Sequence, residues 1–346
     1  VEEKFMARCL ELARHGAGRT APNPMVGAVV VHNGVIVGEG YHRCCGEAHA
    51  EVNAIASVRD EAVLRDSTIY VSLEPCSHYG KTPPCAELII RKGIPRVVVG
   101  CMDPFPEVSG RGVRMLRDAS IEVVTGVLEE ECRALNEVFM TFQTEKRPFV
   151  TLKWAESADG FLDRLRESAD VPPVVFSNPI TSARVHKLRA ESAAILVGTR
   201  TALLDNPSLT VRRWGGKSPV RLVIDREGKI PATYHLLDNS VPTLVFTTMR
   251  KEKIGQTEFI PLDFRISIVH QILQCLFERQ LNSLMVEGGS IVLQQFLDSG
   301  YWDQAIVEQS TLVLGSGVKA PVFPFGQQCF ESFGGHVFRH YTHHRE

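Results

Sequence analysis

The sequence predicts an α/β protein made of two domains. Its 346 residues exceed what one compact domain commonly holds. Short apolar runs alternate with helical patterns along the whole chain, which favours parallel strands joined by helical crossovers. A polar segment at 141–148, which ends in Pro148, is typical of a linker. We therefore expect one domain over residues 1–145 and a second over residues 146–346.

In the first domain, an amphipathic helix is expected over residues 1–16. Two strands should follow at 26–31 and 35–37, because Asn33-Gly34 between β-branched runs favours a tight hairpin. The remaining strands are predicted at 69–73, 96–100 and 121–124. The remaining helices are predicted at about 49–59, at 85–92, from 110, and as one long helix from 129 towards 144. This order predicts a layered fold.

The second domain repeats the alternation of strand and helix. Its strand-like runs are 149–153, 194–197, 220–224, 243–246, 283–286 and 305–314. Its helical patterns are 178–190, 266–280 and 290–297. The last twenty residues hold His336, His340, His343 and His344 and no recognisable motif, so we expect a solvated tail.

Charge and composition exclude several classes of protein. The chain has 38 basic and 40 acidic residues, which gives no electrostatic signature for nucleic acid or an anionic membrane. No apolar run approaches the roughly 20 residues that a membrane span needs. The first residues lack the features of a signal peptide, so we expect a cytoplasmic protein. Nine dispersed cysteines predict free thiols, some of them on a metal.

Two segments carry the residues of a metal site. One residue separates His49 from Glu51, and Cys76, which follows Pro75, precedes Cys85 by nine positions. One histidine and two cysteines suit tetrahedral zinc with its fourth position open to water. A carboxylate two residues from the histidine can take that water's proton and pass it to a leaving amine. The pattern predicts a zinc-dependent hydrolytic deaminase.

A structural interpretation of the same residues makes His49 a polar helix residue and the cysteines buried thiols. The metal site is favoured because its four residues, His49, Glu51, Cys76 and Cys85, occur in the order of the deaminase pattern. The pattern of nucleobase deaminases has two residues between its cysteines, whereas eight separate them here. Cys44 and Cys45 are expected to be loop thiols, because adjacent cysteines rarely bind one metal ion.

Three further motifs accompany the metal site. They are Pro22-Asn23-Pro24-x-Val26-Gly27, the run Ser77-His78-Tyr79-Gly80-Lys81-Thr82-Pro83-Pro84, and Gly110-Arg111-Gly112. With them, the first domain resembles the deaminase half of the RibD/RibG family of bifunctional riboflavin-biosynthesis enzymes. The resemblance implies a cytidine-deaminase-like, three-layer α/β/α fold. It also implies hydrolysis of the 2-amino group of 2,5-diamino-6-ribosylamino-4(3H)-pyrimidinone 5′-phosphate.

The resemblance also assigns roles to single residues of this domain. The implied Zn²⁺ ligands are His49, Cys76 and Cys85. Glu51 would shuttle the proton, and Asn23 would hydrogen-bond the pyrimidine or the ribose. The candidates for the ribose-phosphate end of the substrate are His42, His78 and Lys81. One departure affects a substrate contact, because the family's Asp-Pro-Asn-Pro loop reads Asp103-Pro104-Phe105-Pro106 here.

The second domain has a weaker motif of its own, Val286-Glu287-Gly288-Gly289-Ser290, between a predicted strand and a predicted helix. Glycines at such a turn let a phosphate approach the amides of the helix start, although a tight turn fits equally well. Other short motifs resemble the C-terminal half of the same family. They are Leu152-Lys153, Asp159-Gly160, Leu196-Val197-Gly198 and the run from Leu204 to Arg212.

This second resemblance implies a dihydrofolate-reductase-like α/β domain. It would use NADPH to reduce the ribosyl group of 5-amino-6-(5-phosphoribosylamino)uracil to ribityl. The residues implied at the NADPH site are Ala155, Thr201, Asp205, Gly289 and Ser290. Those implied to face the substrate are Arg189, Leu209, Arg212 and Glu287, with the arginines suited to its phosphate. Three candidates for the proton donor remain open: Lys153, Asp205 and Glu287.

The segment 163–176 departs from the family. The Trp-Ile-Thr-Ser run of many members corresponds in register to Val175-Phe176-Ser177-Asn178, which contains no tryptophan. We therefore expect the cofactor contacts at this edge to differ.

Three alternative functions fit the same residues. The chain could be a deaminase with an inactive second domain, or a zinc deaminase that acts on another base. It could also be a binding module with structural zinc, although such a site normally has four protein ligands and only three are in register. The family suggests a small-molecule pyrimidine ribotide substrate, no nucleic-acid or membrane partner, and a homo-oligomer (a dimer or tetramer).

Overall fold

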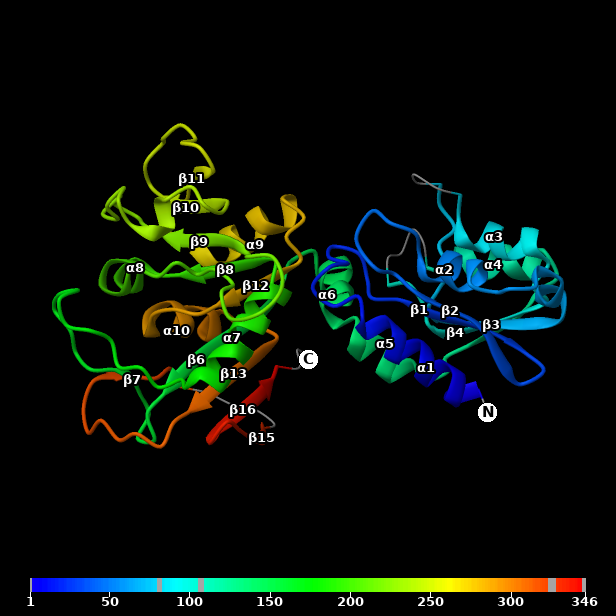
Figure 1. The fold of residues 1–346 in the computed structure, drawn as a ribbon. Coiled ribbons are helices and arrows are strands. Elements are labelled where there is room, and N and C mark those ends of the chain that lie inside the picture. Colours follow the sequence, from blue (N-terminus) through cyan, green and yellow to red (C-terminus); the bar gives the residue numbers. More distant parts are fainter. Residues whose placement is uncertain (1, 80–82, 105–108, 323–327, 344–346) are drawn as a thin grey trace. The chain divides into compact units, whose positions relative to one another are not determined.

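The computed structural model describes residues 2–79, 83–104, 109–322 and 328–343. The chain forms two compact units, Val1–Lys146 and Arg147–Glu346, each built around its own large β-sheet (Figure 1). Among the described residues, every helix is too short or too polar to cross a lipid bilayer.

The sheet of the first unit contains five strands in the order β2-β1-β3-β4-β5. Their bounds are β1 Gly27–His32, β2 Val35–Tyr41, β3 Ser67–Leu73, β4 Arg96–Cys101 and β5 Glu122–Thr125. β1 is antiparallel to β2 and β3, whereas β3, β4 and β5 are parallel. Asn33 and Gly34 both have positive φ between β1 and β2, so the predicted hairpin is confirmed.

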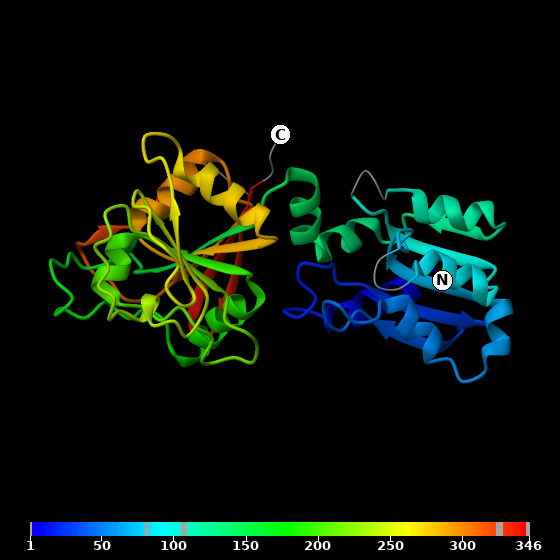
Figure 2. The same cartoon turned by 90° about the horizontal axis from the view of Figure 1, so that it is seen from above.

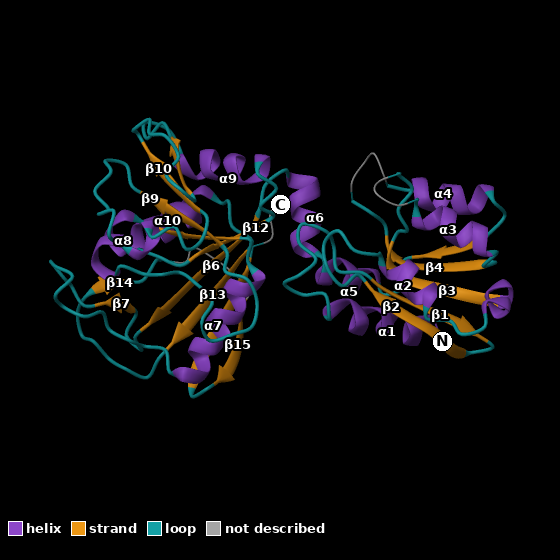
Figure 3. Cartoon of the chain, turned by 45° about the horizontal axis from the view of Figure 1, so that its top comes forward, coloured by secondary structure: helices purple, strands orange, loops and turns teal. Residues whose placement is uncertain are grey.

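Helices cover both faces of this sheet. The helices of the first unit are α1 Glu2–Arg14, α2 Ala50–Ala56, α3 Cys85–Lys92, α4 Arg111–Asp118, α5 Glu129–Leu135 and α6 Glu137–Glu145, with a 3₁₀ turn η1 at Glu61–Asp66. Alternate strand residues point to opposite faces, so Val30 packs with α2, α3 and α4 while Val29 packs with α1 and α5. Figure 3 shows the strands between α3 and α4 on one side and α1 and α5 on the other. The predicted three layers are confirmed.

The prediction of one long helix from residue 129 towards 144 is wrong, because Asn136 divides it into α5 and α6. Its φ and ψ angles of −112° and 23° lie outside the helical range. The side-chain amide of Asn136 accepts a hydrogen bond from the backbone NH of Met25 (2.8 Å) and donates one to the Met25 carbonyl (2.9 Å). The chain around Met25 is thereby fixed next to the motif that contains Asn23.

The linker predicted at 141–148 is also wrong over most of its length. Helix α6 continues to Glu145, and the chain turns at Lys146, whose φ is 55°. Arg147 is buried in the second unit, where its guanidinium donates two hydrogen bonds of 2.6 Å to the Asp303 carboxylate. The charged residues of this segment thus belong to ordered structure.

The main sheet of the second unit contains nine strands in the order β11-β10-β9-β8-β12-β6-β13-β16-β15. Their bounds are β6 Phe149–Glu156, β8 Ala194–Val197, β9 Val220–Ile224, β10 Thr243–Thr247, β11 Thr257–Pro261, β12 Ser283–Val286, β13 Gln304–Gln309, β15 Gln328–Phe333 and β16 His336–Thr342. All neighbours from β11 to β13 are parallel, whereas β16 is antiparallel to β13 and to β15. A separate pair joins β7 Phe161–Asp163 to β14 Val318–Lys319.

Four helices flank this sheet among the described residues, together with a 3₁₀ turn η2 at His235–Leu237. They are α7 Pro179–Glu191, α8 Thr199–Asp205, α9 Ile268–Glu278 and α10 Ser290–Ser299. The apolar sides of α9 and α10 pack with Leu152 and Leu196 of the sheet, whereas Ala202 and Leu188 of α8 and α7 pack on the opposite face. Figure 2 shows α9 and α10, in yellow-orange and orange, on the opposite side of the sheet from the green helix α7.

The solvated tail predicted from residue 327 is wrong, because residues 328–342 form the hairpin β15–β16. Phe338 and Tyr341 are buried in the second unit, and this burial holds the strands in place. His343 stacks on Trp302 with ring centres 4.5 Å apart, and His340 lies 3.4 Å from a Glu331 oxygen. His344 lies outside the described residues.

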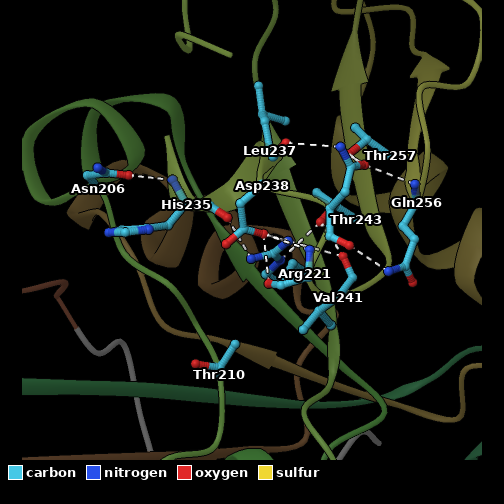
Figure 4. A network of polar contacts seen from close by, with 12 residues as sticks. Asn206, Thr210, Arg221, His235, Leu237, Asp238, Val241, Thr243, Gln256 and Thr257 are labelled. Carbon is cyan, nitrogen blue, oxygen red and sulfur yellow. Dashed lines mark hydrogen bonds and ion pairs between the residues drawn. The ribbon is translucent and has the colours of Figure 1, made fainter. Parts of the chain in front are cut away.

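A buried arginine holds the end of the sheet near α8. Arg221 of β9 is fully enclosed, and its guanidinium donates hydrogen bonds to Thr243, His235 and Asp238 (Figure 4). Such complete pairing makes the burial of the charge tolerable. The backbone NH of His235 also donates to the side chain of Asn206, the residue that ends α8 (2.8 Å). The network therefore anchors the helix that carries Thr201 and Asp205.

Candidate active sites

The three predicted metal ligands meet at one point in the first unit. His49 is the N-cap of α2, Cys76 follows β3, and Cys85 is the first residue of α3. Nδ1 of His49 lies 3.6 Å from the Cys76 sulfur and 3.4 Å from the Cys85 sulfur. The three ligand atoms lie within 4.8 Å of one another. One nitrogen and two sulfurs at this spacing fit a zinc ion that keeps one position open.

The surroundings of Cys76 favour its thiolate. Hydrogen bonds from the thiol and backbone NH of Cys85 and from His49 lower the pKa of Cys76, although burial opposes them. The thiolate is the form of cysteine that binds a metal. The donor set therefore has the chemistry as well as the spacing of a zinc site.

Glu51 lies in the first turn of α2 and is buried beside these ligands. Burial raises its pKa to about 7, and the negative charge of Cys76 adds to the effect. A carboxyl group with a pKa near neutrality can both accept and release a proton, as a hydrolytic deaminase requires.

A cavity of about 380 Å³ opens over this cluster. Asn23, His42 and His78 line it together with His49, Glu51 and Cys76. The Nδ2 of Asn23 donates to Nε2 of His42 (3.2 Å), and Nδ1 of His42 donates to the Ala48 carbonyl (3.1 Å). Burial lowers the pKa of His42, in agreement with a neutral ring that donates on one side and accepts on the other. Lys81 and Phe105 lie outside the described residues.

Sequence reasoning missed Glu74, which lies between the strand β3 and the metal ligand Cys76. Its buried carboxylate accepts hydrogen bonds from the backbone NH groups of Asp103, Gly110, Gly112 and Val113, at 3.0 to 3.3 Å. Gly112 is required here, because a Cβ at this position would lie 2.0 Å from the Pro75 carbonyl. Glu74 thus holds the start of α4 against the cavity. The motif Gly110-Arg111-Gly112 was the only signal of this contact in the sequence.

A second cavity, of about 1000 Å³, lies in the second unit. Nine of the residues predicted for this half line it: Lys153, Ala155, Arg189, Thr201, Asp205, Arg212, Glu287, Gly289 and Ser290. Leu209 does not line it, because it is buried in the apolar cluster with Ala202. The lining residues come from strands and helices that are far apart in the sequence.

The turn between β12 and α10 shapes one wall of this cavity. A Cβ at Gly288 would lie 2.9 Å from Val197 and 3.0 Å from Thr201. Gly289 has a φ of 78°, and a Cβ there would lie 3.2 Å from the Thr201 hydroxyl. The turn therefore has no room for side chains, and it leaves the start of α10 open to a phosphate-bearing cofactor such as NADPH.

Charged residues beside this turn form a fixed pair. Arg189 donates two hydrogen bonds to the Glu287 carboxylate, of 3.1 and 2.6 Å. The charge of Arg189 lowers the pKa of Glu287 despite its burial. Burial lowers the pKa of Lys153, while the charges of Glu287 and Glu308 oppose this effect. Lys153 is thus a buried amine that releases its proton more readily than an exposed lysine does.

Sequence reasoning missed Arg166, which is buried in the segment that departs from the family. Its guanidinium pairs with both Asp163 and Asp205. Asp205 is therefore already engaged by an arginine. A lone arginine in a loop gave no signal in the sequence.

His186 of α7 is a second missed residue of this cavity. Its Nδ1 accepts a hydrogen bond from the backbone NH of Arg212 (3.0 Å). Burial and the charges of Arg189 and Arg212 lower its pKa to about 4. The guanidinium of Arg212 contacts the hydroxyl of Thr210 (2.9 Å) and is otherwise exposed to the cavity.

Comparisons with known families divide the chain in the same way. The model of the cytidine and deoxycytidylate deaminase zinc-binding region matches residues 1–101, and that of the RibD C-terminal domain matches residues 148–332. The riboflavin biosynthesis protein RibD of Aquifex aeolicus is 43% identical over 330 residues, covering 92% of this chain and 89% of that protein. The RibD of Escherichia coli is 35% identical over 337 residues, covering 92% and 90%.

Solved structures agree with these matches. The diaminohydroxyphosphoribosylaminopyrimidine deaminase/5-amino-6-(5-phosphoribosylamino)uracil reductase of Thermotoga maritima superimposes with a TM-score of 0.89 at 40% identity, covering 99% of this chain and 98% of that chain. One form of Acinetobacter baumannii RibD gives a TM-score of 0.88 at 30% identity, covering 99% of each chain. The predicted cytidine-deaminase-like and dihydrofolate-reductase-like folds are confirmed.

The two sites and these matches define a bifunctional enzyme that combines a zinc-dependent deaminase with an NADPH-dependent reductase. The chain belongs to the RibD family of riboflavin biosynthesis proteins. The predicted enzyme class and its two cofactors, Zn²⁺ and NADPH, are thereby confirmed.

Proposed function

We propose that residues 1–145 deaminate 2,5-diamino-6-ribosylamino-4(3H)-pyrimidinone 5′-phosphate and that residues 146–346 then reduce the product, 5-amino-6-(5-phosphoribosylamino)uracil. The observation that carries the proposal is that each unit has its own cavity with the side chains that its reaction needs. The Thermotoga maritima relative, similar over nearly the whole chain, is described as the enzyme of both steps.

In the deaminase site, His49, Cys76 and Cys85 would hold zinc, which supplies a Lewis acid for the activation of water. Glu51 would take a proton from the attacking water and deliver it to the amine that leaves as ammonia. Asn23 and His42, already joined by a hydrogen bond, would orient the substrate. His78 and Lys81 would contact its ribose phosphate. The buried position of Glu51 suits this role, because a proton held there is not lost to bulk solvent.

In the reductase site, NADPH supplies the hydride, and the chain must orient the sugar and provide a proton. Ala155, Thr201, Asp205, Gly289 and Ser290 would contact the cofactor. We propose Lys153 as the proton donor, because arginines already engage the other two candidates, Asp205 and Glu287. Leu209 would contribute only through its backbone, since its side chain is buried.

The phosphate of the substrate would bind to Arg212. Arg189 is committed to Glu287 through two hydrogen bonds, so its guanidinium is less available to a phosphate. Arg212 contacts only a threonine hydroxyl among the described side chains and is exposed at the cavity. Arg189 would then act by orienting Glu287 towards the substrate.

We further propose that the enzyme is cytoplasmic and forms a dimer or tetramer, without a nucleic-acid or membrane partner. The near balance of 38 basic and 40 acidic residues supports the absence of a polyanionic partner. Analytical ultracentrifugation of the purified chain tests the oligomer, and a monomer at micromolar concentration would contradict it.

A coupled assay tests the two reactions and their order. Purified protein with its zinc quantified is given the diaminopyrimidine ribotide, first without and then with NADPH. Ammonia release without NADPH, followed by oxidation of NADPH once it is added, is the expected result. Ammonia alone would indicate an inactive second domain. The absence of both signals from a protein with one zinc per chain would indicate another base as substrate.

A further inference from the structure

Glu308 of β13 is a carboxylate with no solvent exposure, and both of its oxygens have partners. Oε2 accepts a hydrogen bond from the hydroxyl of Ser177 (2.6 Å). Oε1 accepts one from Nδ1 of His336 on β16 (2.7 Å). These two contacts fix the plane of the carboxylate, and they require His336 to carry its proton on Nδ1. The carboxylate is therefore held by the C-terminal hairpin on one side and by the segment before α7 on the other.

The same carboxylate faces Lys153. Strand β6 is the parallel neighbour of β13, and Nζ of Lys153 lies 3.9 Å from Oε2 of Glu308. A buried ammonium group needs a nearby negative charge. Glu287 is the other carboxylate that acts on Lys153, but two hydrogen bonds tie it to Arg189. Among the described residues, Glu308 is thus the carboxylate within ion-pair distance of Lys153, whereas Glu287 acts on Lys153 from beyond this distance and is also held by Arg189.

We infer that Glu308, fixed by Ser177 and His336, is a positioning residue that holds Lys153 in place and protonated for the reduction. This inference rests on the proposed role of Lys153 as proton donor. It gives the hairpin β15–β16 a part in the reductase site, because His336 completes the support of Glu308. The charged and titratable groups that act on Lys153 and Glu308 are Arg189, Glu287 and His336, and His186 acts in turn on Glu287.

Glu308→Gln tests the inference, because it keeps the shape of the side chain and removes its charge. Loss of a carboxylate about 4 Å away lowers the pKa of the ammonium by about one unit. Above the pH at which the kcat of the parent begins to decline, we expect the reductase kcat to fall by up to about tenfold, while KM changes less than about twofold. The pH above which kcat declines should move about one unit lower. A variant with the kcat, KM and pH profile of the parent would overturn the inference.

His336→Gln removes the imidazole that hydrogen-bonds to Glu308 but keeps the negative charge of Glu308. The reductase kcat should therefore fall by a smaller factor of about three. The matched control is His340→Gln. His340 lies on the same strand, pairs with Glu331, and is not among the groups that act on Lys153. If Glu308→Gln does not fold, as judged by tryptophan fluorescence, the His336→Gln and His340→Gln pair decides the question. Equal rates in these two variants would exclude a role for His336.

A second readout does not depend on turnover. The rate at which acetic anhydride labels Lys153, measured by mass spectrometry against pH, follows the fraction of free amine. In Glu308→Gln the midpoint of this curve should move to lower pH, and in His340→Gln it should stay. If the parent oxidises no NADPH, the proposed reductase function fails, yet the labelling curve still decides whether Glu308 supports Lys153. An unchanged midpoint would contradict the inference.

Discussion

The two cavities differ in how their functional residues are distributed along the sequence. In the deaminase cavity, the groups that would do the chemistry come from two short segments. His49 and Glu51 lie at the start of α2, whereas Cys76 follows β3 and Cys85 begins α3. In the reductase cavity, Lys153, Arg189, Asp205 and Glu287 come from four elements across the second unit. We call the deaminase site compact, because a few neighbouring groups perform the reaction. We call the reductase site dispersed, because many separate contacts share the binding of its ligands. One substitution should therefore abolish most of the deaminase activity, whereas one substitution in the reductase site should only reduce its activity.

The largest expected effect tests the compact site. Glu51→Gln should lower ammonia release about 10³-fold, because an amide cannot transfer the proton. Zinc content, measured by atomic absorption, and reduction of the deaminated substrate should both stay at parental values. Glu47→Gln, an exposed neighbour, is the control and should behave as the parent. More than a tenth of the parental ammonia release in Glu51→Gln would remove this residue from its role.

The next largest effect is expected at the substrate-binding part of the reductase cavity. Arg212→Ala should lower the reductase kcat/KM about 30-fold, mainly through KM, because a charge-assisted contact to phosphate contributes about 2 kcal/mol. Deaminase activity should not change. The adjacent exposed residue provides the control Arg213→Ala. Equal losses in both variants, or a parallel loss of deamination, would contradict the assignment of Arg212 to the phosphate.

The cofactor side of the same cavity should respond more weakly. Gly289→Ala combines a positive φ with a Cβ that would press on Thr201, so the Kd for NADPH should rise about tenfold. Titration of NADPH fluorescence measures this Kd. Gly300→Ala introduces a similar positive-φ strain at the other end of α10, where the added Cβ would have no atom within 4 Å, and should leave the Kd unchanged. An unchanged Kd in Gly289→Ala would place NADPH elsewhere.

The smallest expected effect is on the pH dependence of the unfolding free energy. The pKa of His186 is about 4 in the folded chain, below its ordinary value of 6.5. The unfolded chain therefore binds more protons between these values, and stability falls as the pH drops from about 6.5 towards 4. Between pH 7.5 and about pH 5.8, the parent should lose about 1 kcal/mol more unfolding free energy than His186→Asn, which keeps an acceptor for the Arg212 backbone NH.

Urea unfolding followed by tryptophan fluorescence measures this difference in the second unit alone. All three tryptophans of the chain, Trp154, Trp214 and Trp302, lie there. His270→Asn, an exposed histidine on α9, is the control and should keep the pH dependence of the parent. Equal losses of stability in the parent and in His186→Asn would show that His186 is not held neutral by folding.

The difference between the cavities also explains what sequence reasoning could find. The zinc cluster lay within local motifs. The spacing of strands and helices was enough to predict a layered α/β fold, and the family resemblance implied its three layers. Asn136 was missed because its break of the helix depends on a hydrogen bond with Met25, far away in the sequence. Glu74 was missed for the same reason, since its partners lie on a loop that the fold alone brings close.

In the second unit, the motifs located the cavity and several of its charged residues, but not two that organise the ion pairs around it. Arg166 and Glu308 acquire their roles from partners that no periodicity links to them. The C-terminal hairpin was misassigned because its histidines dominated the composition, while Phe338 and Tyr341 provide the burial that orders it. Local patterns therefore predict elements well, whereas buried ion pairs require the tertiary structure.

Strand β6 has a consequence for the order in which the chain becomes active during synthesis. Its two neighbours in the sheet, β12 and β13, begin only at residues 283 and 304. Until the ribosome has released them, β6 has two unpaired edges, and Lys153 has neither Glu287 nor Glu308 beside it. The first unit, whose strand neighbours are all close in sequence, can fold while the second is still being translated. A nascent chain should therefore gain its hydrolytic activity before its reductive one, in the order in which the two reactions follow each other.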